Sequence, residues 1–280
     1  MVQGRKAAIL VGQAALIAAL AACGGGSSSK LALDGVPPEQ IYQIGQRTLT
    51  VDRDPKKAVT IFAEIERQYP YTIWARRALI QEAVSQHRAR KFDDARTTAQ
   101  RYIDTYPGDE DAAYAKYIIA LTYYDQIDDV GRDQKMTYDA LQALRAVIQD
   151  YPDSEYAKSA ILKFDLAFDH LAGKEMEVGR YYLKQGDYTA AINRFRVVVE
   201  QYQTTTQTPE ALYRLIECYL SLGITDQAQT AGAILGHNFQ STVWYRDGYR
   251  VLTGQGLAPK ASATGWLSEI YRQTVQGKWL

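Results

Sequence analysis

Few side chains in this 280-residue chain have the type and spacing that catalysis or metal binding requires. Neither His87 nor His170 has a second metal ligand three or four residues further along its expected helix, and the third histidine, His237, is distant from both. The acidic pairs Asp93-Asp94 and Asp128-Asp129 fall in expected turns, where carboxylates cap helices or face solvent. The sequence also lacks a glycine-rich phosphate-binding loop. We therefore expect a protein that is not an enzyme and that holds no cofactor and no metal ion.

One cysteine lies where a covalent modification is expected. An apolar run from Ala7 to Ala22 follows two basic residues and is short for a membrane span, as in a signal peptide. The run ends in Leu20-Ala21-Ala22-Cys23, which resembles the lipobox of bacterial lipoproteins, in which the cysteine is acylated and becomes the new N-terminus. We expect residues 1–22 to be removed and Cys23 to carry lipid. An ordinary secretory signal with an incidental cysteine is the alternative.

The residues around the expected lipid site indicate a location. Gly24 follows the cysteine, and by resemblance to proteobacterial lipoproteins it favours the outer membrane over the inner one. Residues 23–37 are rich in Gly and Ser, which is typical of a flexible tether. We expect a protein that is anchored to the outer membrane by lipid and faces the periplasm. The second cysteine, Cys218, is expected to be a small core residue, with a reactive thiol as the alternative.

The charge balance narrows the class of partner. Lys plus Arg number 32 and Asp plus Glu number 32, so the formal net charge is zero, which argues against nucleic acid as a partner. The charge is uneven along the chain, however. Residues 71–107 carry seven basic residues against four acidic ones, and residues 108–133 carry seven acidic residues against two basic ones. Such blocks form solvated faces or orient a partner.

These residues lie in a chain that repeats. Five segments place an alanine eleven residues before an aromatic residue: Ala58 to Tyr69, Ala95 to Tyr106, Ala140 to Tyr151, Ala191 to Tyr202 and Ala228 to Phe239. Apolar or small residues recur four and seven positions after the alanine, which marks one stripe of an amphipathic helix. The pattern resembles the second helix of a tetratricopeptide repeat. It predicts an all-α fold, a right-handed α-solenoid superhelix of about five repeats.

The expected helix pairs divide the chain. They span residues 39–69, 72–106, 110–151, 154–171 followed by 175–202, and 208–239. We divide the chain into a signal peptide (1–22), a lipidated cysteine with its tether (23–37), repeats one and two (38–107), repeat three with an insertion and a long helix (108–171), repeats four and five (172–253), and a linker with a short tail (254–280). The tail from Trp266 is expected to form a short amphipathic helix that either docks on the repeats or is disordered.

Tyrosine is common, with 21 residues against 6 Phe and 4 Trp. Many of the tyrosines fall on the expected first helices of the pairs, which line the inner face of a repeat superhelix. A tyrosine there serves either the core or a peptide-binding groove, because its ring is apolar and its tip is polar.

The lipobox, the tether and the five repeats together resemble the BamD family of lipoproteins in the outer-membrane β-barrel assembly machine. The strings that carry the likeness are YPYTIWARRA (69–78), YYDQI (123–127), VGRD (130–133), YPDSEYA (151–157), VGRYY (178–182), AAINRF (190–195) and LGHNF (235–239). The likeness runs from Cys23 to about Leu252, and the tail after Gly254 matches nothing in it. Gln203 and Gln240 stand where proline is commoner.

The resemblance implies a scaffold whose two ends bind different partners. The C-terminal repeats would bind a POTRA domain of the barrel-forming subunit, in a complex with accessory lipoproteins, and the N-terminal repeats would receive unfolded outer-membrane protein clients. Carried over by motif, the POTRA side comprises Asn193, Arg194 and Arg196, and the client side comprises Tyr71, Trp74, Arg76 and Arg77. Helix stability is the rival role for Arg194.

Two other functions stay open at this stage. A periplasmic repeat lipoprotein that organises cell-wall or division enzymes would show the same lipobox and repeats. Loss of barrel proteins on depletion would favour assembly, whereas wall or septation defects would favour this alternative. An enzyme with an unrecognised site is the third possibility.

Overall fold

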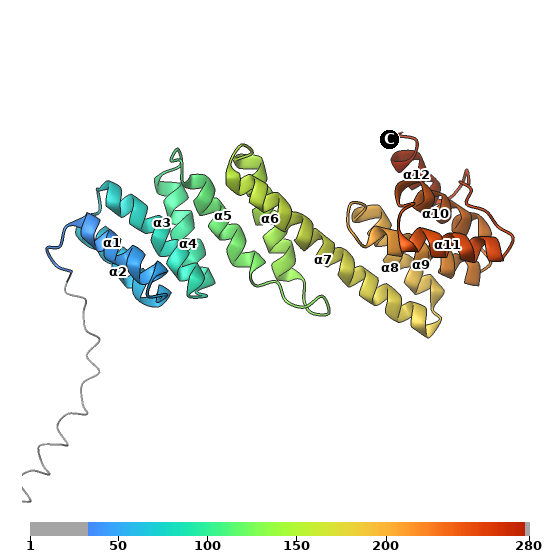
Figure 1. Cartoon of the computed structure of the whole chain (residues 1–280), viewed down its shortest axis with the longest axis horizontal. Coiled ribbons are helices and arrows are strands. Elements are labelled where there is room, and N and C mark those ends of the chain that lie inside the picture. The colour runs from blue at the N-terminus through green and yellow to red at the C-terminus, as the bar shows by residue number, and fades with distance from the viewer. Residues whose placement is uncertain (1–32, 278–280) are drawn as a thin grey trace, which may run out of the picture.

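The computed structural model describes residues 33–277, which form an elongated row of helices (Figure 1). The helices are α1 (Pro38–Thr50), α2 (Pro55–Gln68), α3 (Ile73–Arg88), α4 (Phe92–Thr105), α5 (Ala112–Tyr124), α6 (Lys135–Asp150), α7 (Glu155–Gln185), α8 (Tyr188–Gln201), α9 (Thr208–Ser221), α10 (Thr225–Asn238), α11 (Val243–Gly254) and α12 (Trp266–Thr274). No residue from 33 to 277 lies in a strand, so the all-α prediction is confirmed for this range. The expected signal peptide and Cys23 lie outside the described residues.

The helices stack in chain order. Each helix from α1 to α10 packs against the next one, and alternate helices also meet, α1 with α3, α3 with α5, α5 with α7 and α9 with α11. A repeat protein shows this pattern because each helix pair buries its apolar face against the neighbouring pair. The described chain is therefore the helical-repeat solenoid that the sequence predicts.

The alanine stripe is the buried face of the second helix in each pair. All five of its alanines are fully buried: Ala58, Ala95, Ala140, Ala191 and Ala228. Four positions later, Phe62 in α2 and Phe195 in α8 are also fully buried, each against a glycine of the preceding helix. A β-carbon would lie 2.6 Å from the Phe62 ring at Gly45 and 2.4 Å from the Phe195 ring at Gly179. Both rings therefore require a glycine opposite them.

The aromatic residue at the end of each stripe builds one recurring junction. It is the C-cap residue of the second helix, and its N–H donates to the carbonyl four residues back, at 2.8–3.1 Å, in Tyr69, Tyr106, Tyr151, Tyr202 and Phe239. The backbone N–H three residues later donates to the aromatic residue's own carbonyl in all five junctions. The hydroxyl at that later position also donates to this carbonyl in Thr72, Ser154, Thr205 and Thr242. The junctions with Gln203 and Gln240 keep this geometry without proline.

The helix α7 corrects one expectation. The predicted break between residues 171 and 175 is wrong, because Glu155–Gln185 is one helix of 31 residues, and the expected boundary at 171/172 falls inside it. The residue behind the error is Gly173. A lone glycine among good helix formers costs only about 1 kcal/mol relative to alanine and does not stop a helix. The first half of α7 packs on α6 and its second half on α8, so it joins two parts of the solenoid (Figure 1).

The C-terminal tail docks on the repeats. The expected helix pairs end at residue 239, but α11 forms beyond them, behind its cap Thr242. Residues 258–262 then run back along α10, with hydrogen bonds from Lys260 N–H to the Gln229 carbonyl (3.2 Å) and from Gln229 Nε2 to the Ala258 carbonyl (2.8 Å). Next, α12 packs on α10 and buries Leu267 and Ile270. Docking, rather than disorder, is therefore the outcome for residues 266–274.

Candidate partner-binding surfaces

The first candidate surface lies at the junction between α2 and α3. Thr72 caps α3, because its Oγ1 accepts a hydrogen bond from the Ala75 N–H at 3.2 Å while donating to the Tyr69 carbonyl at 2.9 Å. The turn fixed in this way leaves the side chain of Tyr71 fully exposed. Tyr71 can therefore meet a partner without rearrangement of the fold.

Trp74 belongs to the core and to the surface at once. Its ring centroid lies 5.3 Å from that of Tyr42 in α1, and Tyr42 in turn contacts Phe62. The exposed Arg77 places its guanidinium 5.4 Å from the Trp74 ring. A cation over an aromatic face at such a site contributes about 0.5–1 kcal/mol. The structure thus brings Trp74 and Arg77 together, one turn from Tyr71.

Arg76 takes part in a different contact. Its Nη1 lies 2.7 Å from Asp109 Oδ2, in the turn between α4 and α5. Asp109 Oδ1 accepts from the Tyr102 hydroxyl at 2.6 Å and from the Asp111 N–H at 3.0 Å. Burial favours a higher pKa for Asp109, but these two hydrogen bonds and Arg76 outweigh it and lower the pKa. Arg76 therefore ties α3 to the next junction, and its expected role toward a client stays a prediction.

The basic and acidic blocks of the sequence meet in the fold. Besides the pair of Arg76 and Asp109, His87 Nε2 lies 2.9 Å from Asp125 Oδ2 at the end of α5. Arg96 donates to Thr122 Oγ1 at 3.1 Å, and its guanidinium lies 4.4 Å from the Tyr123 ring. Within residues 33–277, one arginine–aspartate pair and one histidine–aspartate contact thus join the two blocks, and Arg96 meets uncharged partners on α5.

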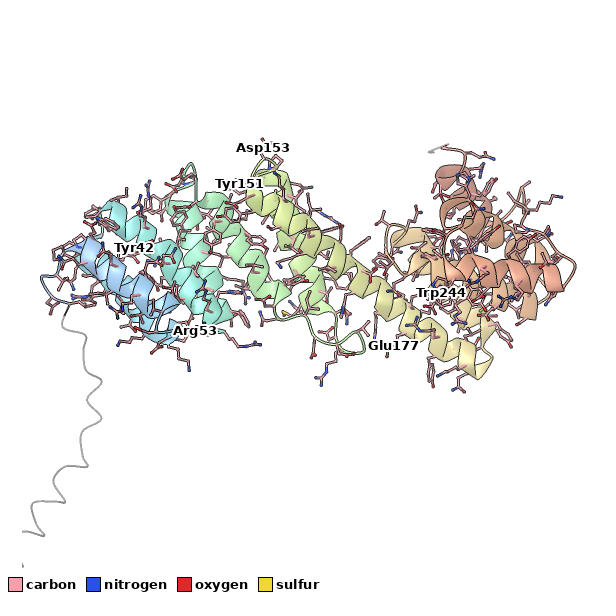
Figure 2. All side chains as sticks on the ribbon, viewed as in Figure 1. Tyr42, Arg53, Tyr151, Asp153, Glu177 and Trp244 are labelled. Atoms are coloured by element: carbon pink, nitrogen blue, oxygen red, sulfur yellow. The ribbon has the colours of Figure 1, made fainter. Side chains whose placement is uncertain are left out.

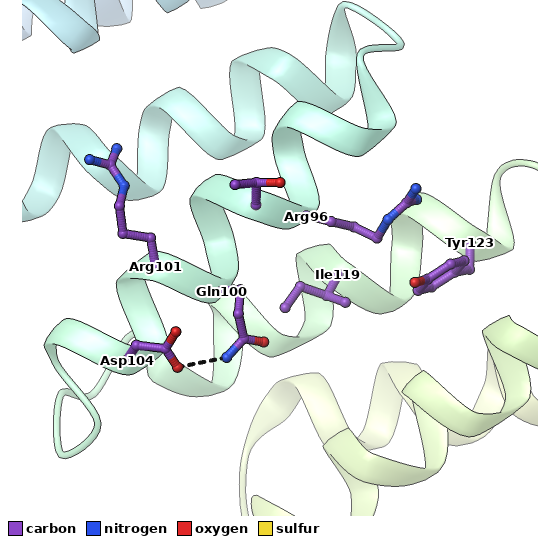
Figure 3. Close-up of a pocket in the computed structure, with 7 residues that line it drawn as sticks. Arg96, Gln100, Arg101, Asp104, Ile119 and Tyr123 are labelled. Atoms are coloured by element: carbon purple, nitrogen blue, oxygen red, sulfur yellow. Dashed lines mark hydrogen bonds between the residues drawn. The ribbon is translucent and has the colours of Figure 1, made fainter.

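An open hollow of about 550 Å³ lies between α4 and α5 (Figure 3). Its lining residues are Arg96, Thr97, Gln100, Arg101, Asp104, Ile119 and Tyr123. Both arginines are compensated, because Arg101 holds Glu66 with two hydrogen bonds of 2.6 and 2.9 Å and Arg96 pairs with Asp93. No sequence pattern indicates this hollow, whose walls come from the two consecutive helices α4 and α5.

The second candidate surface lies on α8, in the other half of the solenoid. Asn193, Arg194 and Arg196 are all exposed, yet they do not form one cluster. Arg194 Nη1 donates to Glu175 Oε2 of α7 at 3.1 Å, which agrees with the rival, stabilising role. Arg196 lies on the side of α8 that also carries Asn193, three residues earlier, and its guanidinium is 5.1 Å from the Trp266 ring of α12. The structure therefore groups Asn193 with Arg196 and turns Arg194 toward α7.

Several aromatic residues of the first helices, which the sequence assigns to either the core or a groove, join adjacent first helices. The pairs are Tyr42 with Trp74, Tyr114 with Tyr156, and Tyr213 with Trp244, with ring centroids 5.3, 4.9 and 5.5 Å apart. Tyr42 and Trp244 mark the seams near the two ends of the row (Figure 2). Burial raises the pKa of the Tyr114 and Tyr156 hydroxyls. Sequence reasoning missed this role, whose only signal is the recurrence of aromatic residues one repeat apart.

Cys218 lies in the core of the described chain. The thiol of Cys218 is fully buried in α9, and burial raises its pKa to about 12, so the core interpretation is confirmed. In the part of the chain that the structure describes, no three His, Cys, Asp or Glu side chains form a metal-binding group. No helix in residues 33–277 combines the length and apolar character needed to cross a membrane.

Comparisons with known proteins follow the same stretch of chain. The model of the family YfiO, described as "Outer membrane lipoprotein", matches residues 34–234. The chain is 44% identical to the outer membrane protein assembly factor BamD of Caulobacter vibrioides over 259 residues, 92% of this chain and 84% of the relative. It is 39% identical to BamD of Rickettsia prowazekii over 231 residues, 82% of this chain and 91% of the relative.

Among solved structures, the chain is similar to a thermophilic TPR protein of Thermus thermophilus. The sequence identity is 18% and the TM-score is 0.36, and the match covers 75% of this chain and 95% of that one. The family match begins just before α1 and ends within α10, so it includes both candidate surfaces. The resemblance found in the repeated strings is confirmed by these relatives. The chain belongs to the BamD family of outer membrane protein assembly factors.

Proposed function

We propose that this protein is a lipid-anchored scaffold of the outer-membrane β-barrel assembly complex, facing the periplasm. Its C-terminal repeats bind a POTRA domain of the barrel-forming subunit, beside accessory lipoproteins, and its N-terminal repeats hold unfolded outer-membrane protein clients. Family membership supports the complex. The observation that supports the division of labour is the placement of two exposed surfaces on separate halves of one solenoid.

The N-terminal surface suits an extended, unfolded chain. Tyr71 offers a fully exposed ring with a hydroxyl that both donates and accepts hydrogen bonds. Arg77 offers guanidinium donors that the Trp74 ring holds close to the surface. Such a chain presents backbone carbonyls, aromatic rings and carboxylates, which these groups bind without needing a folded partner.

The C-terminal surface suits a folded partner. Asn193 and Arg196 lie on one side of α8, on a rigid helix whose opposite face is buried through Ala191, Phe195 and Val198. A rigid helix face presents its side chains in a fixed geometry, and an arginine fork matches a carboxylate of a partner. A domain such as POTRA can supply that carboxylate at a fixed position.

The helix α7 keeps the two surfaces apart. Its 31 residues span about 46 Å at 1.5 Å per residue. A client held near α3 and a barrel subunit held at α8 then keep a fixed relation, set by one continuous helix. Acyl groups on Cys23 add the third attachment, to the membrane, where two acyl chains suffice for stable anchoring.

Photo-crosslinking in living cells tests this assignment. A crosslinking amino acid replaces Tyr71, Asn193 or, as the control, Leu162, which is exposed in the first half of α7. We expect adducts with unfolded barrel clients from position 71 and with a POTRA-containing barrel protein from position 193, and neither from position 162. Adducts with cell-wall or division enzymes from positions 71 and 193, joined by septation defects on depletion, would establish the alternative function instead.

A further inference from the structure

The C-terminal tail is tied to the α8 surface. Residues 255–277 lie beyond the family match, which ends at residue 234, yet they contact three helices of the repeats. The strap before α12 follows α10, where Ser262 N–H donates to Thr230 Oγ1 at 2.9 Å and Gln227 Nε2 donates to the Thr264 carbonyl at 3.0 Å. The strap therefore holds the start of α12 at a fixed place beside the repeats.

Trp266, the first residue of α12, lies at the centre of these contacts. Its Nε1 donates to the Tyr219 hydroxyl of α9 at 2.8 Å, which fixes the plane of the indole. The same indole faces the guanidinium of Arg196 on α8, at 5.1 Å from the ring centroid. Behind it, Leu267 and Ile270 are buried and hold α12 in place. The indole is therefore a fixed platform for one arginine.

Arg196 keeps most of its hydrogen-bonding capacity. Its Nε donates to Glu200 Oε1 at 2.7 Å, on the next turn of α8. Its two terminal amino groups make no hydrogen bond to any residue of the range 33–277. An arginine side chain normally loses much rotamer freedom on binding, and stacking on an aromatic face restrains it beforehand. The arginine is thus pre-oriented with its fork available.

We propose that α12 is part of the C-terminal partner surface, and that Trp266 is a positioning residue that holds Arg196 ready for a carboxylate of the partner. The inference rests on the proposed function, in which that partner is the POTRA domain. It assigns to the tail a role in binding, through Arg196, besides its packing on α10.

Binding of the detergent-solubilised, full-length mature protein to the purified POTRA region of the barrel subunit tests the proposal. The central variant is Trp266→Leu, which keeps apolar volume above α10 and removes the ring. We expect its Kd to rise about five-fold, because the partner must then restrain an arginine side chain that the indole no longer holds. Trp266→Phe keeps a ring over Arg196 and should restore binding, although it loses the hydrogen bond to Tyr219. Tyr219→Phe, which removes only that hydroxyl, is the matched control for the bond.

A double-variant cycle separates positioning from packing. If Trp266 acts through Arg196, Trp266→Leu should weaken binding in the wild-type background and add nothing in an Arg196→Ala background. An equal loss in both backgrounds, or no loss from Trp266→Leu while Arg196→Ala weakens binding, would overturn the inference and leave the proposed function standing. No binding of the wild-type protein to the POTRA region would overturn the proposed function first. Melting temperatures of all variants show whether α12 stays docked.

Discussion

At the scale of single residues, the stack depends on places where a side chain is missing. Phe195 fills the seam between α7 and α8 only because Gly179 has no β-carbon, and Phe62 uses Gly45 in the same way. At Gly173, six residues before Gly179 in the same helix, an added β-carbon would lie 3.5 Å from a Val130 methyl, which is ordinary contact. Two glycines of one helix therefore have opposite roles, one required by packing and one merely tolerated.

Alanine substitutions distinguish these roles. Gly179→Ala should lower the free energy of unfolding by about 1–3 kcal/mol, because its methyl overpacks a buried ring. Gly173→Ala should raise it by about 0.5–1 kcal/mol, because alanine restricts the unfolded chain and suits a helix interior. Urea unfolding followed by circular dichroism measures both changes. A stable Gly179→Ala protein would contradict the seam geometry.

Glu82 makes stability depend on pH. Its carboxylate is largely buried in α3, where Gln86 Nε2 donates to it at 2.9 Å and Arg101 is 4.0 Å away. Burial is the main cause that raises its pKa from 4.5 to about 7. The folded state therefore holds a proton that the unfolded state releases between about pH 4.5 and 7. Stability is greatest below that window and falls as the pH rises through it.

Glu82→Gln mimics the protonated side chain and should remove this loss. We expect the variant to be more stable than the wild type at pH 8, by an amount on the order of 2 kcal/mol, and the difference to shrink toward pH 5. Thermal unfolding at a series of pH values measures the effect. Glu177→Gln, at an exposed position of α7 (Figure 2), is the control and should show no such pH-dependent gain. Parallel pH profiles for Glu82→Gln and the wild type would argue against a buried, protonated Glu82.

At the scale of elements, the sequence predicts what local patterns determine. The alanine stripe predicts the second helix of each pair and the face that it buries. The aromatic residue at the end of the stripe marks the C-cap of that helix. The junctions after these helices are also predictable from the sequence. A hydroxyl or carboxyl side chain follows the aromatic residue by three positions in every copy, from Thr72 to Thr242. That signal predicts the start of α11, which helix periodicity alone had missed.

Other elements depend on contacts that no local pattern encodes. The glycine at 173 is compatible with a break and with a continuous α7, because a lone glycine costs a helix only about 1 kcal/mol relative to alanine. Trp266 of α12 contacts Tyr219, 47 residues earlier, and the exposed Arg196, and neither contact is visible in the local sequence. The candidate residues of α8 follow the same logic, because Asn193, Arg194 and Arg196 are adjacent in sequence but only their neighbours on α7 and α12 separate their roles.

A proline in the middle of α7 tests that element directly. Gly173→Pro removes one N–H donor and places the ring against the carbonyl four residues back, which costs about 3 kcal/mol in a helix interior. We expect lower helical content and new protease cleavage near residue 173, with Gly173→Ala as the matched control. Unchanged cleavage and melting would show that the two halves do not depend on a continuous α7.

At the scale of the whole molecule, the feature that matters is where the two candidate surfaces lie along the solenoid. The two candidate surfaces lie on different halves of a row that α7 makes continuous, and the described chain begins close to the end where α1 lies (Figure 1). With the proposed membrane anchor near that end, the candidate surface on α3 lies closer to the membrane attachment along the row than the surface on α8. Under the proposed function, the scaffold acts by raising the effective concentration of one partner near another. Effective concentrations of tethered sites reach the millimolar range, and the resulting gain in avidity is about 10²–10⁴-fold.

The anchor prediction can be separated from partner binding. Cys23→Ala should abolish incorporation of labelled palmitate, because the acylated thiol is gone, whereas Cys218→Ala should keep it, since that thiol is buried in α9. Because partners at the membrane also retain the protein, Cys23→Ala combined with Arg196→Ala should be released into the periplasmic fraction more fully than either single variant. The combined variant should also assemble fewer barrel proteins, since both its membrane anchor and its grip on the barrel subunit are weakened. Palmitate labelling that survives Cys23→Ala would show that the lipid is carried elsewhere, and full release by Cys23→Ala alone would show that the α8 surface adds no retention of its own.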